Sequence, residues 1–221
     1  MSRRPLRRRR LAIEVAFVAG LLFAGSVLPS TALRARDDGG AAPQRVGSSV
    51  GSTTTTVPAC KVSIVAAGDF STPLPDIDKT GLQATILAPT YAMLLGDLQY
   101  VDGSLASYLN VYATTAWAKL NPIARPTPGN HDYKTPGAAG YYSYFGVAPF
   151  YAYNIGCGWR AYSLNSEIDL TRQIAFVAAD IAAHPNKRLV AYWHKPVWSS
   201  GRHGDNARFA KLIAAFGGRL E

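Results

Sequence analysis

The chain of 221 residues contains only two cysteines, and charged residues make up just 17% of it. Two cysteines are too few for a small domain held together mainly by disulfides. Apolar residues account for 48%, so the chain can bury a sizeable core and is not a disordered chain. No second cysteine or histidine stands at ligand spacing from Cys60 or Cys157, which argues against a metal site at either. We expect these two residues either to form one disulfide or to remain separate as small apolar residues.

Acidic residues are also scarce, and the net charge is +9, but the positive excess lies at one end of the chain. Residues 1–36 hold eight arginines and one glutamate, whereas residues 37–221 hold 15 basic and 13 acidic residues. The part that can fold is therefore nearly neutral and lacks the basic surface on which nucleic-acid binding depends. We expect no nucleic-acid partner, and a basic arm that binds nucleic acid is the least favoured alternative.

The apolar run over residues 15–28 is short for a membrane-spanning helix, which needs roughly 20 residues. It follows the arginine-rich residues 1–10, and a basic segment before a short apolar segment is typical of an export signal. We therefore predict that residues 1–35 are an export signal, or an uncleaved membrane anchor if residues 11–28 all enter the bilayer. Residues 2–6 also loosely match a twin-arginine signal, but an ordinary positively charged flank explains them as well.

Export predicts an extracellular, periplasmic or cell-envelope location, with membrane contact only through this first segment. Residues 36–57 are rich in glycine, serine and threonine and show no apolar periodicity. This composition predicts a disordered linker that separates the export segment from a folded domain over residues 58–221.

Residues 58–221 alternate strand-like and helix-like segments, which predicts an α/β fold. The predicted strands cover residues 61–67, 90–95, 123–127, 151–155, 159–164 and 188–193. Helices are predicted over residues 79–88, 170–184 and 205–216, and after Ser104, which is a suitable N-cap. The turn Gly156-Cys157-Gly158 predicts a hairpin between its two flanking strands.

Apolar residues at helical spacing predict the buried face of three of these helices. The predicted faces are Leu105, Leu109, Tyr112 and Ala116; Leu170, Ile174, Val177 and Ile181; and Phe209, Leu212, Ile213 and Phe216. The tyrosine-rich run over residues 141–145 either packs between a loop and the sheet or lines a sugar or base pocket.

Four of the predicted strands end on polar side chains, namely Asp69, Asp97, Asn130 with His131, and His194. Ligands of α/β folds bind outside the carboxyl ends of the strands. Carboxylate, amide and imidazole groups gathered there suit two divalent cations that share one carboxylate. Taken singly, each aspartate or asparagine is explained equally well as a turn former, and His194 as a core histidine.

The series of motifs in this region resembles a known family. Gly68-Asp69, Gly96-Asp97-Leu98-Gln99-Tyr100, Gly129-Asn130-His131-Asp132 and Trp193-His194 follow one another in this order. The series is similar to that of the calcineurin-like metallophosphoesterases, in particular their purple acid phosphatase-like branch. The resemblance covers about residues 60–221 and implies a metallophosphoesterase-like α/β/β/α sandwich.

The resemblance also implies a metal-ligand set. Asp69 would bind the first metal ion, and Asp97 would bridge both ions. Asn130 and His194 would bind the second ion, while Tyr100 stands where this branch has a tyrosinate ligand; a strand-edge aromatic is the alternative for Tyr100. The cofactors implied are two divalent or mixed-valence metal ions, of iron, zinc or manganese.

Two further histidines are implied as catalytic residues. His131 would donate a hydrogen bond to the phosphoryl oxygens or to the leaving group. His203 matches a substrate-facing histidine of the same branch, with an ordinary loop histidine as the alternative. The implied activity is that of an exported phosphoric ester hydrolase, a phosphomonoesterase, which attacks a small phosphate ester with metal-bound hydroxide.

Two departures from the family pattern limit this reading. Ser71 stands where many members have a histidine, and the final Gly-His-x-His block of the family is missing. We therefore expect a sandwich that is incomplete at its C-terminus, with weak metal binding and slow turnover. The alternative function is a non-catalytic or weakly active phosphoesterase-like domain that binds phosphate-bearing ligands.

Overall fold

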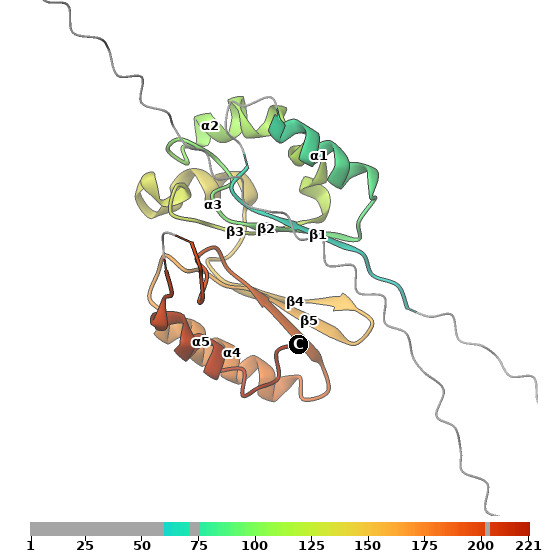
Figure 1. Cartoon of the computed structure of the whole chain (residues 1–221), viewed down its shortest axis with the longest axis vertical. Coiled ribbons are helices and arrows are strands. Elements are labelled where there is room, and N and C mark those ends of the chain that lie inside the picture. Colours follow the sequence, from blue (N-terminus) through green and yellow to red (C-terminus); the bar gives the residue numbers. More distant parts are fainter. Residues whose placement is uncertain (1–59, 71–75, 202–203) are drawn as a thin grey trace, which may run out of the picture. The chain divides into compact units, whose positions relative to one another are not determined.

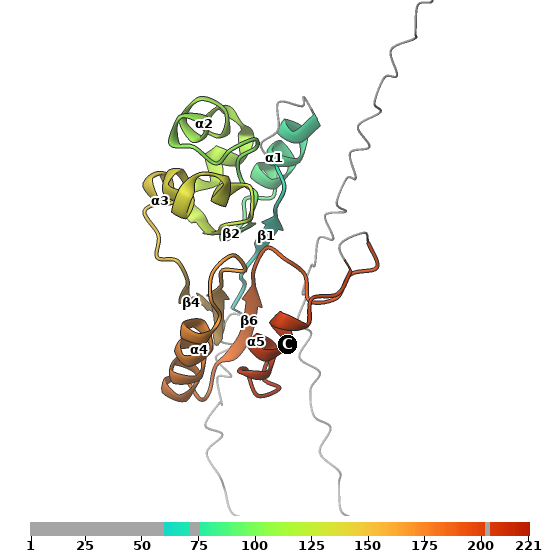
Figure 2. The same ribbon diagram turned by 90° about the vertical axis from the view of Figure 1, so that its left-hand side faces the viewer.

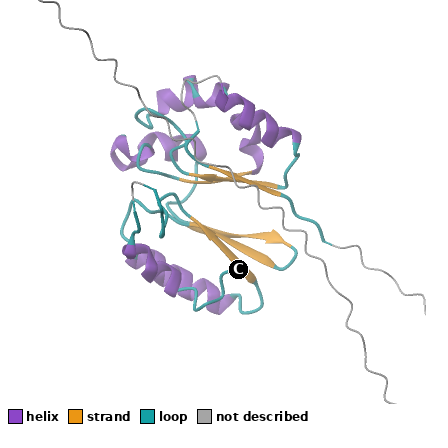
Figure 3. Ribbon diagram, viewed as in Figure 1, coloured by secondary structure: helices purple, strands orange, loops and turns teal. Residues whose placement is uncertain are grey.

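The computed structural model describes residues 60–70, 76–201 and 204–221 as a mixed α/β fold (Figure 3). The predicted export segment and linker, residues 1–35 and 36–57, lie outside the described residues. The strands are β1 (Ile64–Ala67), β2 (Tyr91–Leu95), β3 (Ala124–Thr127), β4 (Tyr151–Gly156), β5 (Trp159–Ser163) and β6 (Arg188–Tyr192). The α-helices are α1 (Asp76–Ile86), α2 (Leu105–Asn110), α3 (Ala139–Phe145), α4 (Thr171–Ala183) and α5 (Ala210–Ala214). The predicted α/β class is confirmed.

Strands β1, β2 and β3 form a parallel sheet with β2 in the centre. The register pairs Ala67 with Leu94 and Leu95 with Thr127, so the three strands end at the same edge. The central strand β2 buries Ala92, Met93 and Leu94 in succession, as expected of a strand that is covered on both faces. Because the strands are parallel, the loops that follow them lie side by side at this edge.

Strands β4, β5 and β6 form the second sheet, in which β4 pairs antiparallel and β6 pairs parallel with β5. The predicted hairpin of β4 and β5 is confirmed. Its turn has positive φ angles at Gly156, Cys157 and Gly158, of 90°, 50° and 80°, a conformation that glycine adopts without steric cost. Both cysteines, Cys60 and Cys157, are disulfide-bonded, so the structure favours the disulfide among the two alternatives.

An apolar cluster joins the two sheets. Its buried members are Met93 of the first sheet and Ile155, Ala161 and Tyr192 of the second. The guanidinium group of Arg125 lies 5.4 Å from the ring centres of both Tyr91 and Tyr153, which belong to different sheets. This arrangement places a cation between two aromatic rings and lets a charged side chain enter the sheet–sheet contact.

Hydrogen bonds cross between the sheets as well. The hydroxyl groups of Tyr151 and Ser163 both donate to the carbonyl oxygen of Pro126, at 2.8 and 2.9 Å. The hydroxyl of Tyr192 donates to the carbonyl oxygen of Arg125 at 2.8 Å. We call these contacts along β3 the sheet–sheet seam. They fix the position of one sheet against the other more narrowly than apolar packing alone.

Helices cover the outer face of each sheet (Figures 1 and 2). Helices α1, α2 and α3 pack on the first sheet, and α4 and α5 pack on the second. Within the described ranges, no helix is long and apolar enough to cross a membrane.

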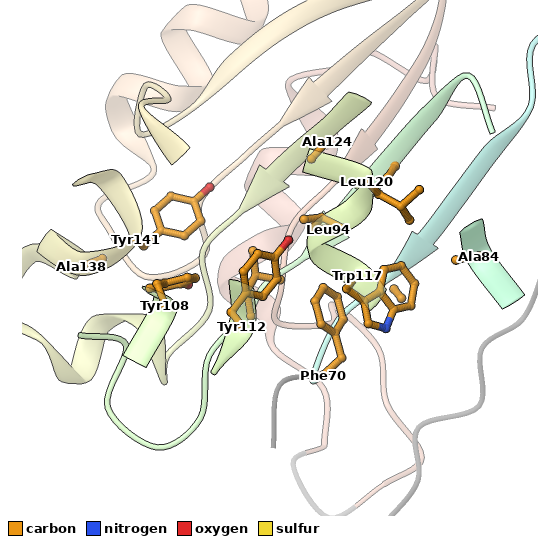
Figure 4. Close-up of a cluster of buried hydrophobic side chains, with 13 residues drawn as sticks. Phe70, Ala84, Leu94, Tyr108, Tyr112, Trp117, Leu120, Ala124, Ala138 and Tyr141 are labelled. Carbon is orange, nitrogen blue, oxygen red and sulfur yellow. The ribbon is translucent and has the colours of Figure 1, made fainter. Parts of the chain in front are cut away.

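The first core lies between β1–β3 and their helices and is rich in aromatic residues (Figure 4). Phe70 stacks on Trp117 with ring centres 4.5 Å apart. Tyr108, Tyr112 and Tyr141 are fully buried, so their hydroxyl groups enter the core together with their rings. Buried hydroxyl groups need partners, and Tyr108 and Tyr112 find theirs in Asp132 and Asn121.

The second core lies between β4–β6 and their helices and contains few polar atoms. Helix α4 buries Leu170 and Val177 and packs Ile174 and Ile181 against the same cluster. The segment that ends in α5 buries Phe209, Leu212 and Phe216, with Ile213 beside them. Both predicted apolar faces are confirmed, although the second helix is shorter than predicted because residues 207–209 form a 3-10 turn.

The predicted face of the helix after Ser104 is wrong in part. Ser104 is the N-cap, since its side chain accepts the backbone N–H of Ser107, but α2 ends at Asn110. Leu105 and Leu109 are 40% and 55% exposed, whereas Tyr108 is fully buried. The helix is rotated relative to the prediction because the hydroxyl of Tyr108 bonds to a buried carboxylate, which apolar spacing alone does not reveal.

The tyrosine-rich run over residues 141–145 belongs to α3. Tyr141 is fully buried, and its neighbours Tyr142, Tyr144 and Phe145 pack against the first core. Packing is therefore the alternative that the structure shows for this run, and none of these residues lines the cavity described below.

Candidate metal centre

Side chains that follow four strands line one cavity of about 570 Å³. Asp69 follows β1, Asp97 follows β2, Asn130 follows β3 and His194 follows β6. The other described residues around it are Tyr100, His131, Lys195, Pro196, Gly204 and Asn206. The structure thus brings the predicted strand-end residues together, even though Asp97 and His194 follow strands of different sheets.

Asp69 and Asp97 share an unusual backbone conformation. Their φ angles are 58° and 50°, in the left-handed region that side-chain-bearing residues seldom adopt. The backbone N–H of Asp69 donates to the carbonyl oxygen of Gly96 at 3.0 Å, which ties the loop after β1 to the loop after β2. Residues held in such conformations cluster at functional sites, and here both carboxylates reach the same cavity.

Asp97 is at the centre of the contacts around the cavity and is only 3% exposed. Its Oδ1 accepts the backbone N–H of His131 at 2.7 Å, and its Oδ2 lies 3.0 Å from the hydroxyl of Tyr100 and 3.4 Å from Nε2 of His194. Burial raises the pKa of Asp97, but the hydrogen bond and charge of His194, together with His131, outweigh burial and lower it below its usual value. The carboxylate is therefore ionised at neutral pH and available to a cation.

The ring of His194 is oriented by a hydrogen bond to the backbone at the end of β2. Its Nδ1 donates to the carbonyl oxygen of Leu95 at 2.9 Å, which leaves Nε2 toward Asp97. Metal-binding histidines are commonly held in this way through their second nitrogen. Burial lowers the pKa of His194, but the hydrogen bond and charge of Asp97 and the charge of Asp69 raise it to about 9. A cation that binds Nε2 must therefore displace a proton.

The hydroxyl of Tyr100 lies between the two carboxylates. It is 2.8 Å from Oδ1 of Asp69 and 3.0 Å from Oδ2 of Asp97. Burial, and then the negative charges of Asp97 and Asp69, raise the pKa of Tyr100 far above its usual value. Tyr100 therefore carries its proton beside the two carboxylates and would lose it only beside a strong positive charge, and its predicted role as a metal ligand stays a prediction.

His131 and Asn130 stand at the cavity from the loop after β3. The ring of His131 lies against that of Tyr100, with centres 4.2 Å apart, and its Nδ1 is 3.4 Å from the carbonyl oxygen of Val101. Its Nε2 is 3.9 Å from Oδ2 of Asp97. Asn130 is exposed at the same cavity. The structure places both residues at the cavity. The cation-binding role of Asn130 and the substrate-binding role of His131 stay predictions.

Two glycines allow the loops to approach one another. A Cβ atom at Gly129 would overlap Oδ1 and the backbone nitrogen of Asp97, and one at Gly96 would lie 2.6 Å from Cβ of His194. Neither position therefore has room for any side chain. The close approach of the loop after β2 to the loops after β3 and β6 depends on these two residues.

Asp132 is a fully buried carboxyl group beneath the loops, and the sequence prediction gave it no role. It accepts hydrogen bonds from the backbone N–H groups of Gly129 and Leu98 and from the hydroxyl of Tyr108. Burial raises the pKa of Asp132 to about 6, although these hydrogen bonds oppose the shift. Its place in the Gly-Asn-His-Asp block is the only sequence signal that pointed to it.

The donor set fits a divalent cation. Asp69, Asp97 and His194 offer ligand atoms that all lie within 4.8 Å of one another. Carboxylate oxygens and an imidazole nitrogen suit zinc, iron or manganese. For a second ion, the described residues add Tyr100 and Asn130 at the same cavity. Each of two ions that share Asp97 would then have three protein donors. No other cluster of three histidine, cysteine, aspartate or glutamate ligands is found among the residues that the structure describes.

Lys195 lines the cavity directly after His194 and was not predicted. Its Nζ lies 2.6 Å from Oε2 of Glu167, and its backbone N–H lies 3.3 Å from Oγ of Ser166. The predicted catalytic His203 and the departure at Ser71 lie outside the described residues.

In comparisons with known proteins, no protein-family model matches this chain and no curated protein shows significant sequence similarity to it.

Proposed function

We propose that this chain is an exported metal-dependent phosphoric ester hydrolase that acts on small phosphomonoesters. The observation that supports this best is the convergence of Asp69, Asp97 and His194, whose ligand atoms lie within 4.8 Å of one another after three separate strands. The order of helices, sheet, sheet and helices supports the finer proposal that the fold is a metallophosphoesterase-like sandwich (Figure 1).

In this proposal Asp97 is the bridging ligand, because it is the carboxylate that contacts both Tyr100 and His194. Asp69 and Tyr100 complete one position, and Asn130 and His194 complete the other. Two bound cations supply Lewis-acid stabilisation of the phosphoryl group and lower the pKa of a water molecule. Two nearby cations repel each other, and a negatively charged shared ligand offsets this repulsion where a neutral one does not.

His131 binds the phosphoryl group or the leaving oxygen in this proposal. The tilted contact with the ring of Tyr100 and the contact of Nδ1 with the Val101 carbonyl oxygen limit the rotation of the ring, which lines the cavity. When protonated, Nε2 can donate to a phosphoryl oxygen or pass its proton to the leaving group.

The size and lining of the cavity favour a small substrate. Its volume of about 570 Å³ lies within the range of pockets that bind small molecules. Lys195 also lines the cavity, with its charge paired to Glu167. We infer no contact with nucleic acid.

A second candidate is a domain that binds phosphate-bearing ligands with little or no turnover. It is favoured by the small number of strong donors, since only one group of three carboxylate and imidazole ligands converges among the described residues. Such a group holds one cation well, whereas two cations would depend on the weaker donors Tyr100 and Asn130.

The full chain, reloaded with Mn²⁺ or Zn²⁺ after removal of bound metal, is the material that tests these candidates. Hydrolysis of p-nitrophenyl phosphate and metal content per chain are measured for the natural protein and for Asp97→Asn. We expect Asp97→Asn to lower kcat/KM by about 100-fold or more and to lose bound metal, because it removes a charged ligand. The matched control is Asp169→Asn, an exposed residue that accepts the Thr171 amide, a bond that asparagine can also make.

Equal activity in Asp97→Asn and in the natural protein would contradict the hydrolase proposal. Metal binding and phosphate binding without measurable turnover would support the second candidate instead. The control should retain both the metal content and the activity of the natural protein.

A further inference from the structure

Asp132 is a buried carboxyl group that no step of the proposed chemistry uses. It is 0% exposed, lies two residues after Asn130 and does not line the cavity. Burying a carboxyl group destabilises a protein unless its oxygens accept hydrogen bonds. The partners of Asp132 therefore indicate what this residue contributes.

One oxygen of Asp132 contacts both of the loops that carry predicted metal ligands. Its Oδ2 accepts the backbone N–H of Gly129 at 2.7 Å and that of Leu98 at 3.4 Å. Gly129 directly precedes Asn130, and Leu98 directly follows Asp97. A single atom thus bonds to the backbone of both the loop after β2 and the loop after β3, in addition to the bond from His131 N–H to Asp97 Oδ1.

The other oxygen of Asp132 connects these loops to the first core. Its Oδ1 accepts the hydroxyl of Tyr108 at 2.5 Å. Tyr108 belongs to α2 and is 0% exposed. Its ring is enclosed by other rings at centre distances of 5.2–6.5 Å, those of Tyr112, Tyr141, Tyr144 and Phe145. Figure 4 shows Tyr108 with Tyr112 and Tyr141. A ring enclosed in this way holds its hydroxyl in one position.

We propose that Tyr108 and Asp132 are positioning residues that hold the loops after β2 and β3 at the spacing the metal ligands need. Neither residue touches the cavity, and both act through the backbone of Leu98 and Gly129. The part of this proposal that concerns cation binding rests on the proposed function, whereas the part that concerns the loops does not. Loss of the Tyr108 hydroxyl alone should therefore increase the mobility of the loops after β2 and β3, to which Asp132 bonds.

Tyr112 provides a matched control within the same core. It is also 0% exposed and packs against the same rings, but its hydroxyl donates to Oδ1 of Asn121 at 2.8 Å. Tyr112→Phe and Tyr108→Phe thus each remove one buried hydroxyl and keep the ring. They differ in the partner of the lost hydrogen bond. The partner of Tyr108 is Asp132, which also bonds to both loops, whereas the partner of Tyr112 is Asn121.

The experiment measures amide hydrogen exchange of the full chain without added cation, for the natural protein and both variants. We expect residues 96–101 and 128–134 to exchange about tenfold faster in Tyr108→Phe, and no faster in Tyr112→Phe. A titration with Mn²⁺ follows. The dissociation constant should rise about 10- to 100-fold in Tyr108→Phe and stay within about twofold in Tyr112→Phe.

Unchanged loop exchange in Tyr108→Phe, or an equal rise in Tyr112→Phe, overturns the positioning role. Faster loop exchange in a protein whose natural form binds no Mn²⁺ supports the positioning role and rejects the proposed function. Tight Mn²⁺ binding that Tyr108→Phe leaves unchanged overturns the role of the pair in cation binding and leaves the function standing.

If Tyr108→Phe does not fold, Asp132→Asn takes its place. An asparagine keeps an acceptor for the Gly129 amide but loses the charge, so loop exchange should rise above that of the natural protein. Exchange equal to that of the natural protein in Asp132→Asn would overturn the proposal.

Discussion

The half of the molecule built on β1–β3 differs from the half built on β4–β6 in how it combines stability and chemistry. The first half supplies five of the cavity-lining residues, Asp69, Asp97, Tyr100, Asn130 and His131. Its loops contain the two aspartates with positive φ angles and the glycine contacts that leave no room for a side chain. The second half supplies the other five, His194, Lys195, Pro196, Gly204 and Asn206, all from the segment between β6 and α5, and otherwise consists of a hairpin and amphipathic helices.

The two cores show the same difference. The first core contains buried tyrosines whose hydroxyl groups form specific hydrogen bonds, one of them to the carboxylate beneath the loops. The second core is formed mainly by leucine, valine and phenylalanine side chains, which need only to be covered. The difference teaches that in the first half a core residue can affect the candidate site directly, whereas in the second half a core residue should affect stability first.

The largest expected effect is that of Gly129→Ala. A Cβ at this position would overlap the backbone nitrogen and a carboxylate oxygen of Asp97, and backbone cannot move aside as a flexible side chain does. We expect Mn²⁺ binding, measured by calorimetry, to be abolished. Gly201→Ala is the control, because its nearest neighbour is the Ser199 hydroxyl at 3.3 Å. Binding of Gly129→Ala within a few fold of the natural protein would show that this loop is not rigid.

The next effect concerns the second half. Leu212 is 1% exposed, and Leu212→Ala should lower the free energy of unfolding by about 2–5 kcal/mol, measured by urea denaturation. The Mn²⁺ affinity of the protein that remains folded should not change. Leu109→Ala, at a residue that is 55% exposed, should change the free energy of unfolding by no more than about 0.5 kcal/mol. A large loss of affinity in Leu212→Ala would contradict the separation of the two halves.

The smallest expected effect is a dependence of the free energy of unfolding on pH. It arises at His194, a residue of the second half that contacts Asp97 of the first half. The pKa of His194 is raised to about 9, above its usual value of 6.5, so the folded state holds the proton more tightly than the unfolded state. This contribution to stability is fully present below pH 6.5 and is lost as the pH rises through 9. For the cation-free protein, the free energy of unfolding should fall by about 2–3 kcal/mol over this window.

His194→Gln should remove this fall, whereas His184→Gln, at a residue outside the cavity, should retain it. The affinity for Mn²⁺ should rise with pH over the same window, because the cation displaces the proton on Nε2. A free energy of unfolding in His194→Gln that falls as steeply as in the natural protein would assign the pH dependence to other groups.

The polar residues at the ends of the strands could be predicted from the sequence, because each of them follows a short apolar run. Asp69 and Asp97 come after β1 and β2 with a glycine between, and His194 comes shortly after β6. Parallel pairing then brings the ends of β1 and β2 to one edge of the first sheet. His194 reaches the same cavity from the second sheet, which strand pairing alone does not predict. The helix faces of the second half were also predictable, because apolar residues at helical spacing form most of their buried surface. The burial of Gln173 on α4 gave no such signal.

The remainder depends on contacts between residues far apart in the chain, which periodicity does not encode. The face of α2 is set by a hydrogen bond from Tyr108 to a residue 24 positions away, so Leu105 and Leu109 were placed wrongly. The pairing of Lys195 with Glu167 spans 28 positions and gives no local signal. The predicted metal ligands and catalytic roles themselves stay predictions.

The sheet–sheet seam has a consequence for the distance between Asp97 and His194, because these residues follow strands of different sheets. Sliding of one sheet over the other would change that distance. The paired hydroxyl groups on the carbonyl oxygen of Pro126 resist such sliding. Tyr151 and Ser163, which have no chemical role of their own, thus help to fix the distance between Asp97 and His194. A shear motion of the two sheets would lengthen or shorten this distance.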